Sequence, residues 1–225
     1  TAAIRNLCHA LPAPEHRVLY LCDTAVAPLD LYRMLAIELG VTPSHRRSQL
    51  WHDIKKTLVH VVDEQGVVPV VVIDEAQHLS DRFLVDLGGF LNFTFDSRDL
   101  LAMWLVGMPQ LLRNLRMQQH AALAMRVQVH VHVEPLGRAD FTALVEHALR
   151  VAGATERLLS EPAMEILFRT SRGLPRIASK ILRAVLRLAA DKNQSFVDEH
   201  TMQAAIAELS FAADAPPERK EHAAP

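Results

Sequence analysis

The sequence predicts an α/β fold in which a parallel sheet with helices on both faces precedes a small helical domain. Two observations carry this prediction. Apolar runs of strand length alternate with helical patterns up to about residue 133, and such alternation is typical of a parallel sheet covered by helices. After Pro135 the strand patterns stop and only helical patterns follow. We expect a sheet domain at 1–135, a helical domain at 136–210 and a disordered tail at 211–225.

Four segments have the composition of strands. Residues 67–73 are nearly all β-branched, which indicates a strand buried on both faces. Residues 17–22 and 100–106 are apolar runs of similar length, and residues 127–133 alternate between valine and polar residues as a half-buried strand does. Helical patterns fill the remaining segments, at 1–11, 29–39, 48–63, 83–93, 109–116, 120–125, 138–152, 162–171, 175–190 and 198–209.

The composition excludes several classes of protein. Half of the 225 residues are hydrophobic, which is enough for a sizeable core, and a formal net charge of −2 gives no general attraction to nucleic acid. Cys8 and Cys22 lie in apolar surroundings at a spacing that matches no zinc motif, so we expect buried free thiols in a reducing cytoplasm. The first residues do not have the pattern of a signal peptide, and no apolar run approaches the roughly 20 residues that cross a membrane.

The most informative segment is the pair Asp74-Glu75, which directly follows the apolar run at 67–73. Two adjacent carboxylates at the end of a buried strand cost free energy unless they act there, and ligands of open α/β sheets bind at the carboxyl ends of strands. In nucleotide hydrolases an aspartate at this place holds Mg²⁺, and the glutamate after it can polarise the attacking water. The alternative is that Asp74 only caps the next helix.

Four segments together resemble the ExeA and TniB/TnsC group of AAA+ ATPases: IDEAQHLS, LNFTFDSRDLLAMWLVGMPQL, ALAMRVQVHVHVEPL and SRGLPRIASKIL. The resemblance extends from Thr1 to about Leu209, with the segments in the family's order and at its spacing. The group includes secretion ATPases and the ATP-dependent target-selection proteins of transposons. The resemblance implies a P-loop nucleotide-binding fold with a C-terminal helical lid, in which Asp74-Glu75 is the Walker B pair.

The resemblance also assigns two arginines. Arg126 matches the arginine finger that reaches the γ-phosphate in a neighbouring subunit, and Arg176 matches the sensor 2 arginine that reports the phosphate state to the lid. Arginine suits both tasks, because its guanidinium stays charged and forks onto phosphate oxygens. The residues alone leave other interpretations open: either side chain could be a solvated surface group, and Arg113 and Arg116 are rivals for the finger.

One departure from the family pattern lies after the strand predicted at 100–106. The family commonly has Gly-Gln-Pro-Glu-Leu there, with a polar residue near the sensor 1 position. This sequence has Gly107-Met108-Pro109-Gln110-Leu111. A methionine side chain forms no strong hydrogen bond with water or phosphate, so we expect slow hydrolysis unless Gln110 substitutes for it.

The second departure concerns the Walker A loop, G-x-x-x-x-G-K-[ST], whose backbone amides and lysine hold the phosphates. The sequence contains no such run. Thr1 and the helical pattern after it resemble the end of the motif, so we expect the natural protein to continue upstream, with Thr1 as a hydroxyl ligand of Mg²⁺. The resemblance then implies a five-stranded sheet whose first strand, and most of whose phosphate loop, precede Thr1. The alternative is that Thr1 is an arbitrary starting point.

Three smaller features leave two interpretations each. His130 and His132 would share one face of a strand as a metal pair, but no third ligand is apparent and exposed residues are the simpler interpretation. The basic cluster at 45–47 either contacts DNA phosphates or forms a solvated loop. Asp23 either restrains the catalytic glutamate, as a polar residue does at this place in the family, or caps a helix.

The resemblance implies ATP and Mg²⁺ as cofactors and a homo-oligomer, a ring or a filament, as the working assembly. The leading interpretation is an ATP-dependent helper of transposition, with duplex DNA and a transposase as partners. One alternative is an ExeA-like secretion ATPase whose partner is an envelope complex. Another is a nucleotide-gated scaffold with weak hydrolysis, which Met108 favours.

Overall fold

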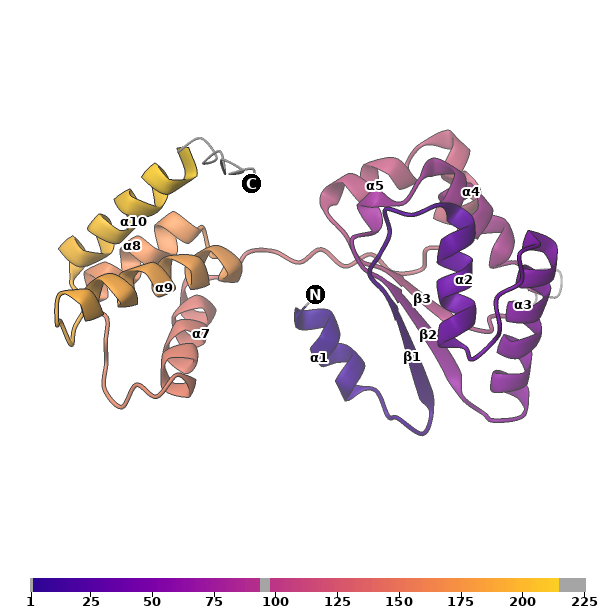
Figure 1. The fold of residues 1–225 in the computed structure, drawn as a ribbon, viewed down its shortest axis with the longest axis horizontal. Helices are drawn as coiled ribbons and strands as arrows, with labels where there is room; N and C mark the ends of the chain where they lie inside the picture. The colour runs from indigo at the N-terminus through magenta and orange to yellow at the C-terminus, as the bar shows by residue number, and fades with distance from the viewer. Residues whose placement is uncertain (1, 94–97, 215–225) are drawn as a thin grey trace, which may run out of the picture. The chain divides into compact units, whose positions relative to one another are not determined.

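The computed structural model describes residues 2–93 and 98–214, and the side chains of all of these except 210–214. The chain divides into two compact units, Thr1–His130 and Val131–Pro225 (Figure 1). Each unit has its own hydrophobic core. The α/β fold class predicted from the sequence, with a parallel sheet followed by helices, is confirmed.

The first unit is built on a three-stranded parallel sheet in the order β1-β2-β3. The strands are β1 (His16–Leu21), β2 (Val68–Ile73) and β3 (Ala102–Leu105), and they fall within the segments predicted at 17–22, 67–73 and 100–106 to within one residue. β2 pairs with both neighbours, which explains its β-branched composition: every residue from Pro69 to Ile73 is buried.

The prediction of a strand at 127–133 is wrong. Residues 128–137 form neither helix nor strand, and Val129, Val131 and Val133 are 74%, 80% and 78% exposed. Alternation specifies which side chains would share a face, but a strand also needs a neighbour that accepts and donates the ladder hydrogen bonds. Among the described residues, 2–93 and 98–214, no segment forms a strand pair with these valines.

Helices of the first unit lie close to their predicted ranges. They are α1 (Ala2–Ala10), α2 (Pro28–Glu38), α3 (Arg47–Asp63), α4 (Asp81–Phe90), α5 (Pro109–Leu115) and α6 (Ala121–Ala124), with short 3₁₀ turns η1 (Ala76–His78) and η2 (Gln118–His120). Sequence signals explain several starts. Ser80 caps α4 by accepting the Phe83 N–H at 3.2 Å, and prolines stand in the first turns of α2 and α5.

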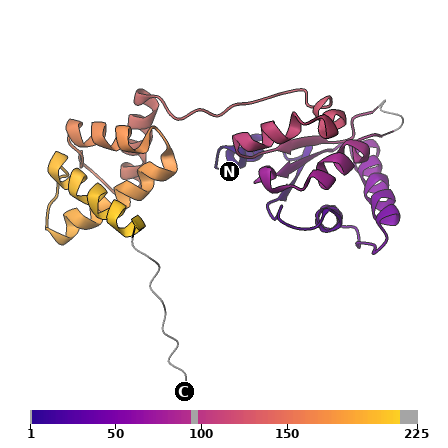
Figure 2. The same cartoon turned by 90° about the horizontal axis from the view of Figure 1, so that it is seen from above.

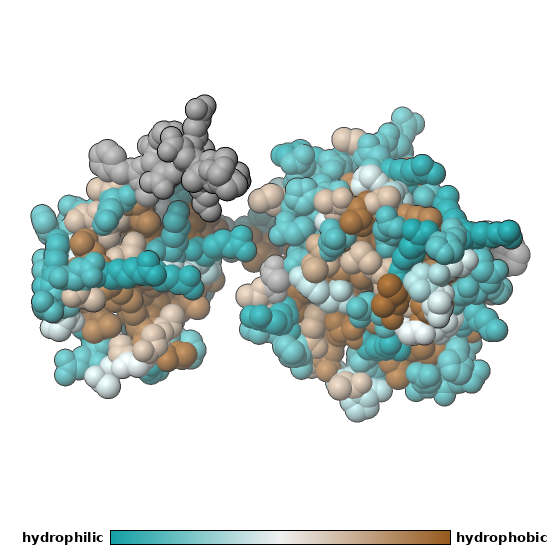
Figure 3. All heavy atoms as spheres, in the orientation of Figure 1, coloured by the Kyte–Doolittle hydropathy of each residue, from teal (hydrophilic) through white to brown (hydrophobic). Residues whose placement is uncertain are grey.

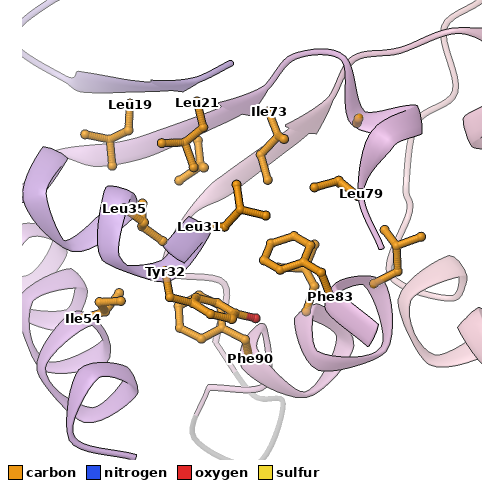
Figure 4. Packing of buried hydrophobic residues seen from close by; sticks show 14 of the residues in the cluster. Leu19, Leu21, Leu31, Tyr32, Leu35, Ile54, Ile73, Leu79, Phe83 and Phe90 are labelled. Atoms are coloured by element: carbon orange, nitrogen blue, oxygen red, sulfur yellow. The ribbon is translucent and has the colours of Figure 1, made fainter. Parts of the chain in front are cut away.

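The core of the first unit lies between the sheet and the helices α2, α3 and α4. Figure 4 shows Leu19, Leu21 and Ile73 pointing from the sheet toward these helices, where Tyr32 and Phe90 lie against each other. The Tyr32 and Phe90 ring centroids are 5.0 Å apart. This packing fixes the strands, and with them the positions of the loops that follow their carboxyl ends.

The second unit is a bundle of α7 (Arg138–Val151), α8 (Glu161–Ser171), α9 (Pro175–Asp191) and α10 (Glu199–Asp214) (Figure 2). α9 turns its apolar side, including Ile181 and Val185, into the core. α10 continues to Asp214 and so includes residues 211–214 of the tail predicted at 211–225. Residues 215–225 lie outside the described residues.

Two further expectations concern the cysteines and membrane-spanning segments. Both cysteines are free, but Cys8 is only half-buried and Cys22 is exposed, so the prediction of buried thiols is wrong for Cys22. Cys22 directly follows β1, where the chain leaves the sheet. No helix in the described parts of the chain combines the length and the apolar character that crossing a membrane requires.

Candidate functional site

The carboxyl ends of the three strands are tied together by backbone hydrogen bonds that continue beyond the sheet. The Asp74 N–H donates to the Leu21 carbonyl and the Val106 N–H to the Ile73 carbonyl, both at 2.9 Å. The Ala76 N–H then returns to the Val106 carbonyl, also at 2.9 Å. The loop after β2 is therefore held between the loops after β1 and β3, where a ligand of an open α/β sheet binds.

Asp74 is buried, with 5% of its surface exposed, and both of its carboxylate oxygens accept hydrogen bonds. Tyr20 donates its hydroxyl to Oδ2 at 2.8 Å, and the Glu75 N–H donates to Oδ1 at 2.9 Å. The hydrogen bond to Asp74 is the main cause that raises the pKa of Tyr20 to about 12, so this phenol stays protonated at neutral pH. Asp74 is not the cap of α4, because Ser80 is.

Glu75 is exposed, and its backbone has the left-handed conformation, with φ 53° and ψ 34°. This conformation is uncommon for a residue with a side chain and persists where the surroundings hold it. Thr24, which is buried, donates its hydroxyl to the Glu75 carbonyl at 3.0 Å. Gln77 donates its side-chain N–H to Glu75 Oε2 at 2.7 Å. Backbone and carboxylate are therefore each held by a separate side chain.

Gln77 also reaches the loop after β3. Its Oε1 accepts the Met108 N–H at 3.1 Å, and a Cβ added at Gly107 would stand 2.7 Å from that oxygen. The Met108 side chain is 63% exposed and adds no polar group to the site. Gln110, the expected substitute, is exposed in the first turn of α5.

The remaining predicted site residues are Arg126, Arg176 and Thr1. Arg126 follows α6 and is half-buried, and its Nε donates to the Gly88 carbonyl of α4 at 3.2 Å. Arg176 belongs to the second unit, where it is exposed in the first turn of α9. Thr1 lies outside the described residues. The roles of all three stay predictions.

The structure gives different outcomes for the three smaller features of the sequence, which are Asp23, the histidine pair and the basic cluster. Asp23 is exposed, and the neighbouring Thr24 makes the contact with Glu75 instead. His130 and His132 are exposed, and no group of three or more His, Cys, Asp or Glu side chains suited to a metal occurs among the residues that the structure describes. In the basic cluster at 45–47, Arg47 pairs with Asp86 and stacks on a tryptophan ring, which gives it a structural role.

Comparison with known proteins decides the family. Residues 1–115 match the family described as AAA domain. The chain belongs to the AAA domain family. The likeness to AAA+ ATPases predicted from the motifs is therefore confirmed at this level.

The chain also has a distant relative, and that match extends beyond the AAA domain into the helices after it. The chain is 28% identical over 223 residues to the general secretion pathway protein A of Aeromonas hydrophila. The match covers 92% of this chain and 41% of the relative, so the chain spans less than half of the relative's length. The relative is a secretion protein and not a transposition protein.

Solved structures agree on the fold. Cdc6p of Pyrobaculum aerophilum has a TM-score of 0.63 at 17% identity, covering 89% of this chain and 56% of that one. The Orc1 protein of Aeropyrum pernix, solved in complex with DNA, has a TM-score of 0.59 at 14% identity, covering 96% of this chain and 57% of that one. At these identities the likeness concerns the fold alone.

The residues at the carboxyl edge of this AAA domain suit a hard divalent cation. Mg²⁺ takes oxygen ligands, often through retained waters, and Asp74 presents a carboxylate whose two oxygens are already oriented by Tyr20 and the Glu75 N–H. The polar environment around this buried carboxylate is the observation that fits a metal–nucleotide site.

Four residues at this edge are not among the site residues predicted from the sequence: Tyr20, Thr24, Gln77 and Gly107. Three of them could have been found. Gln77 and Gly107 stand within the segments that resemble the family, and Thr24 is next to Asp23. Nothing in the sequence marks Tyr20, because its link to Asp74 depends on the register that pairs Tyr20 with Val72.

Proposed function

We propose that this AAA domain binds ATP with Mg²⁺ and hydrolyses it at Asp74 and Glu75, as the motor of a secretion apparatus. The observation that supports the chemistry most is the contrast between the two carboxylates. Asp74 is buried with both oxygens oriented, and Glu75 is exposed beside it in a left-handed conformation. One carboxylate is suited to hold a cation, and the other to accept a proton.

In the proposed mechanism, bound Mg²⁺ would supply neutralisation of the charge that develops on the phosphate oxygens. Asp74 would hold the cation, while Tyr20 keeps its carboxylate oriented. Glu75 accepts a proton from the attacking water at Oε1, because its Oε2 is occupied by Gln77. Thr1 would add a hydroxyl ligand, as its resemblance to the end of the Walker A loop implies.

The two arginines extend the proposal to an oligomer. Arg126 would act in trans on the ATP of a neighbouring subunit, and Arg176 would contact the phosphates from the lid. A mixture of Arg126→Ala and Glu75→Gln subunits tests the first role, since one type of interface then keeps both groups. Some recovery of ATPase activity supports it, and no recovery at any mixing ratio in confirmed oligomers contradicts it.

The secretion role rests on the relative. General secretion pathway protein A is similar to nearly the whole of this chain, whereas none of the relatives given above is a transposition protein. The test is replacement of the natural gene by a Glu75→Gln allele. Export of secreted proteins should stop while the protein remains present at its normal level. Normal export with the altered allele would contradict the secretion role without affecting the proposed chemistry.

A second candidate function, binding of duplex DNA, is favoured by the basic side of α9. Between Glu165 and Asp191 every charged residue is basic. The spacing puts four exposed cations along one side of the helix, and hydrophilic side chains cross the surface over α9 in Figure 3. These four, for which no ion pair within the described residues is found, are Arg176, Lys180, Arg183 and Arg187.

DNA binding through this side would depend strongly on salt, because each phosphate contact releases counterions. Reversing Lys180 to glutamate should weaken binding of a fluorescent duplex and flatten its dependence on salt. Lys56→Glu, an equal charge change in the first unit, is the control. Equal binding by all three proteins, or none at low salt with ATP present, would contradict this second function.

A further inference from the structure

The carboxamide of Gln77 joins two loops of the AAA domain. It donates from Nε2 to Glu75 Oε2 at 2.7 Å, and it accepts the Met108 N–H at Oε1, at 3.1 Å. We infer that Gln77 is a positioning residue that couples the loop after β3 to the carboxylate of Glu75. This inference rests on the proposed role of Glu75 as the base in ATP hydrolysis.

The bridge requires a side chain that both donates and accepts. The Met108 N–H can only donate and an ionised Glu75 can only accept, so the two contacts also fix which end of Gln77 carries the oxygen. A glutamate at position 77 would keep the bond from Met108 but would set a second carboxylate against Glu75. A leucine of similar volume would lose both bonds.

Gly107 leaves room for this bridge. A Cβ at Gly107 would stand 2.7 Å from Gln77 Oε1 and 3.2 Å from the Gln77 backbone nitrogen. Its φ is not in the left-handed region, so the glycine is needed for space rather than for its backbone conformation. The close approach lets the Met108 N–H reach the carboxamide, and a methyl group would push the carboxamide away.

The bridge gives the loop after β3 a contact with the base that the Met108 side chain does not supply. Because the contact runs through the Met108 backbone, a displacement of residues 107–108 moves Gln77 Oε1 and, through the same carboxamide, Glu75 Oε2. The carboxamide also restricts Glu75, an exposed side chain with several rotamers, to one in which Oε1 remains for the water.

The first test measures this coupling without measuring activity. In the full-length protein labelled with ¹⁵N, the Met108 amide resonance is compared with and without the Glu75→Gln substitution. The substitution should move the resonance in the wild-type background, because the Gln77 carboxamide links the two residues. It should leave the resonance unmoved in the Gln77→Leu background, where the bridge is absent.

The control is Gln118→Leu, which removes a carboxamide from an exposed turn and should keep the wild-type response. A Met108 response that survives unchanged in Gln77→Leu would overturn the inference. So would a wild-type Met108 resonance that does not follow Glu75 at all.

The second test uses steady-state kinetics. Gln77→Leu, Gln77→Glu and Gly107→Ala should each lower kcat about tenfold and leave the KM for ATP within twofold, because the base is misplaced but substrate contacts remain. A merely structural Gln77 would instead change stability and KM.

Glu75→Gln, measured beside these variants, separates the proposed function from the proposed coupling through Gln77. Turnover that survives Glu75→Gln contradicts the proposed function itself. Turnover that is lost in Glu75→Gln but unchanged in both Gln77 variants overturns the coupling and leaves the proposed function standing.

Discussion

The carboxyl edge of the sheet and the aromatic cluster of Tyr32, Trp51 and Phe90 differ in whether their polar groups form hydrogen bonds. At the edge, the Tyr20 hydroxyl donates to Asp74 although Tyr20 itself is 41% exposed. In the cluster, the Tyr32 hydroxyl and the Trp51 indole N–H are buried without a hydrogen-bond partner among the described residues. The better-buried tyrosine is therefore the one whose hydroxyl is unsatisfied.

This difference separates stability from function. The aromatic cluster stabilises the fold through the apolar area it buries, and an unsatisfied hydroxyl is a cost that this area offsets. The edge buries less area but fixes the direction of each polar group, which is what a site for a cation and a water molecule requires. Substitutions in the cluster should change the free energy of unfolding, and substitutions at the edge should change chemistry.

Phe90→Ala, in the aromatic cluster, should have the largest effect, and this effect should be on the free energy of unfolding. Phe90 is fully buried between Tyr32 and Trp51, with centroids at 5.0 and 5.4 Å, so its removal should lower the free energy of unfolding by about 3–5 kcal/mol. Chemical denaturation measures the loss. Phe196→Ala is the control, because Phe196 is 47% exposed and should cost far less. Equal losses for the two phenylalanines would contradict the role of the cluster.

Tyr20→Phe should have the next largest effect, and chiefly on metal dependence. The change removes the donor to Asp74 Oδ2, and loss of such an orienting partner typically weakens metal binding by about tenfold or more. The measurement is ATPase rate against Mg²⁺ concentration. An unchanged Mg²⁺ requirement would show that the Tyr20 hydroxyl does not prepare Asp74 for the cation.

The same hydrogen bond predicts a pH effect. The folded-state pKa of Tyr20 is raised from 10.0 to about 12, chiefly by Asp74, so the folded state favours the protonated phenol. The stability gained from this bond is present below pH 10 and is lost as pH rises through about 12. In an alkaline absorbance titration, Asp74→Asn should bring the ionisation of one tyrosine toward 10. A titration identical to that of the wild type would contradict the contact.

The smallest effect is expected from Tyr32→Phe. Burial raises the pKa of Tyr32, and its hydroxyl has no partner, so removing the oxygen should leave stability unchanged or increase it by up to about 1 kcal/mol. Thermal and chemical unfolding measure the change. A loss of more than about 1 kcal/mol would mean that the hydroxyl is satisfied in solution, and the contrast with Tyr20 would then fail.

Much of the fold was predictable because its signals are local. The β-branched run ending at Ile73, the cap at Ser80 and the apolar periodicity of α9 each specify their element without reference to the rest of the chain. The segment at 127–133 has an equally clear local pattern and forms no strand, because a strand depends on a neighbour that the pattern does not describe.

The sequence singles out the two carboxylates of the candidate site but not the geometry around them. Asp74 and Glu75 could be singled out, because adjacent carboxylates after a buried strand are costly without a task. Their partners could not be derived, since Tyr20 and Met108 approach them only through strand register and loop closure across the sheet. The side chain that holds each carboxylate is a property of the tertiary structure.

The most direct test of the central claim is ATP turnover by Glu75→Gln beside ATP binding by the same protein. With Mg²⁺ present, we expect turnover to fall about a hundredfold or more, as loss of a general base should cause, while the affinity for ATP stays within threefold. Glu15→Gln, an exposed glutamate in the same unit, should behave as the wild type. Turnover of Glu75→Gln within threefold of the wild type would contradict the account.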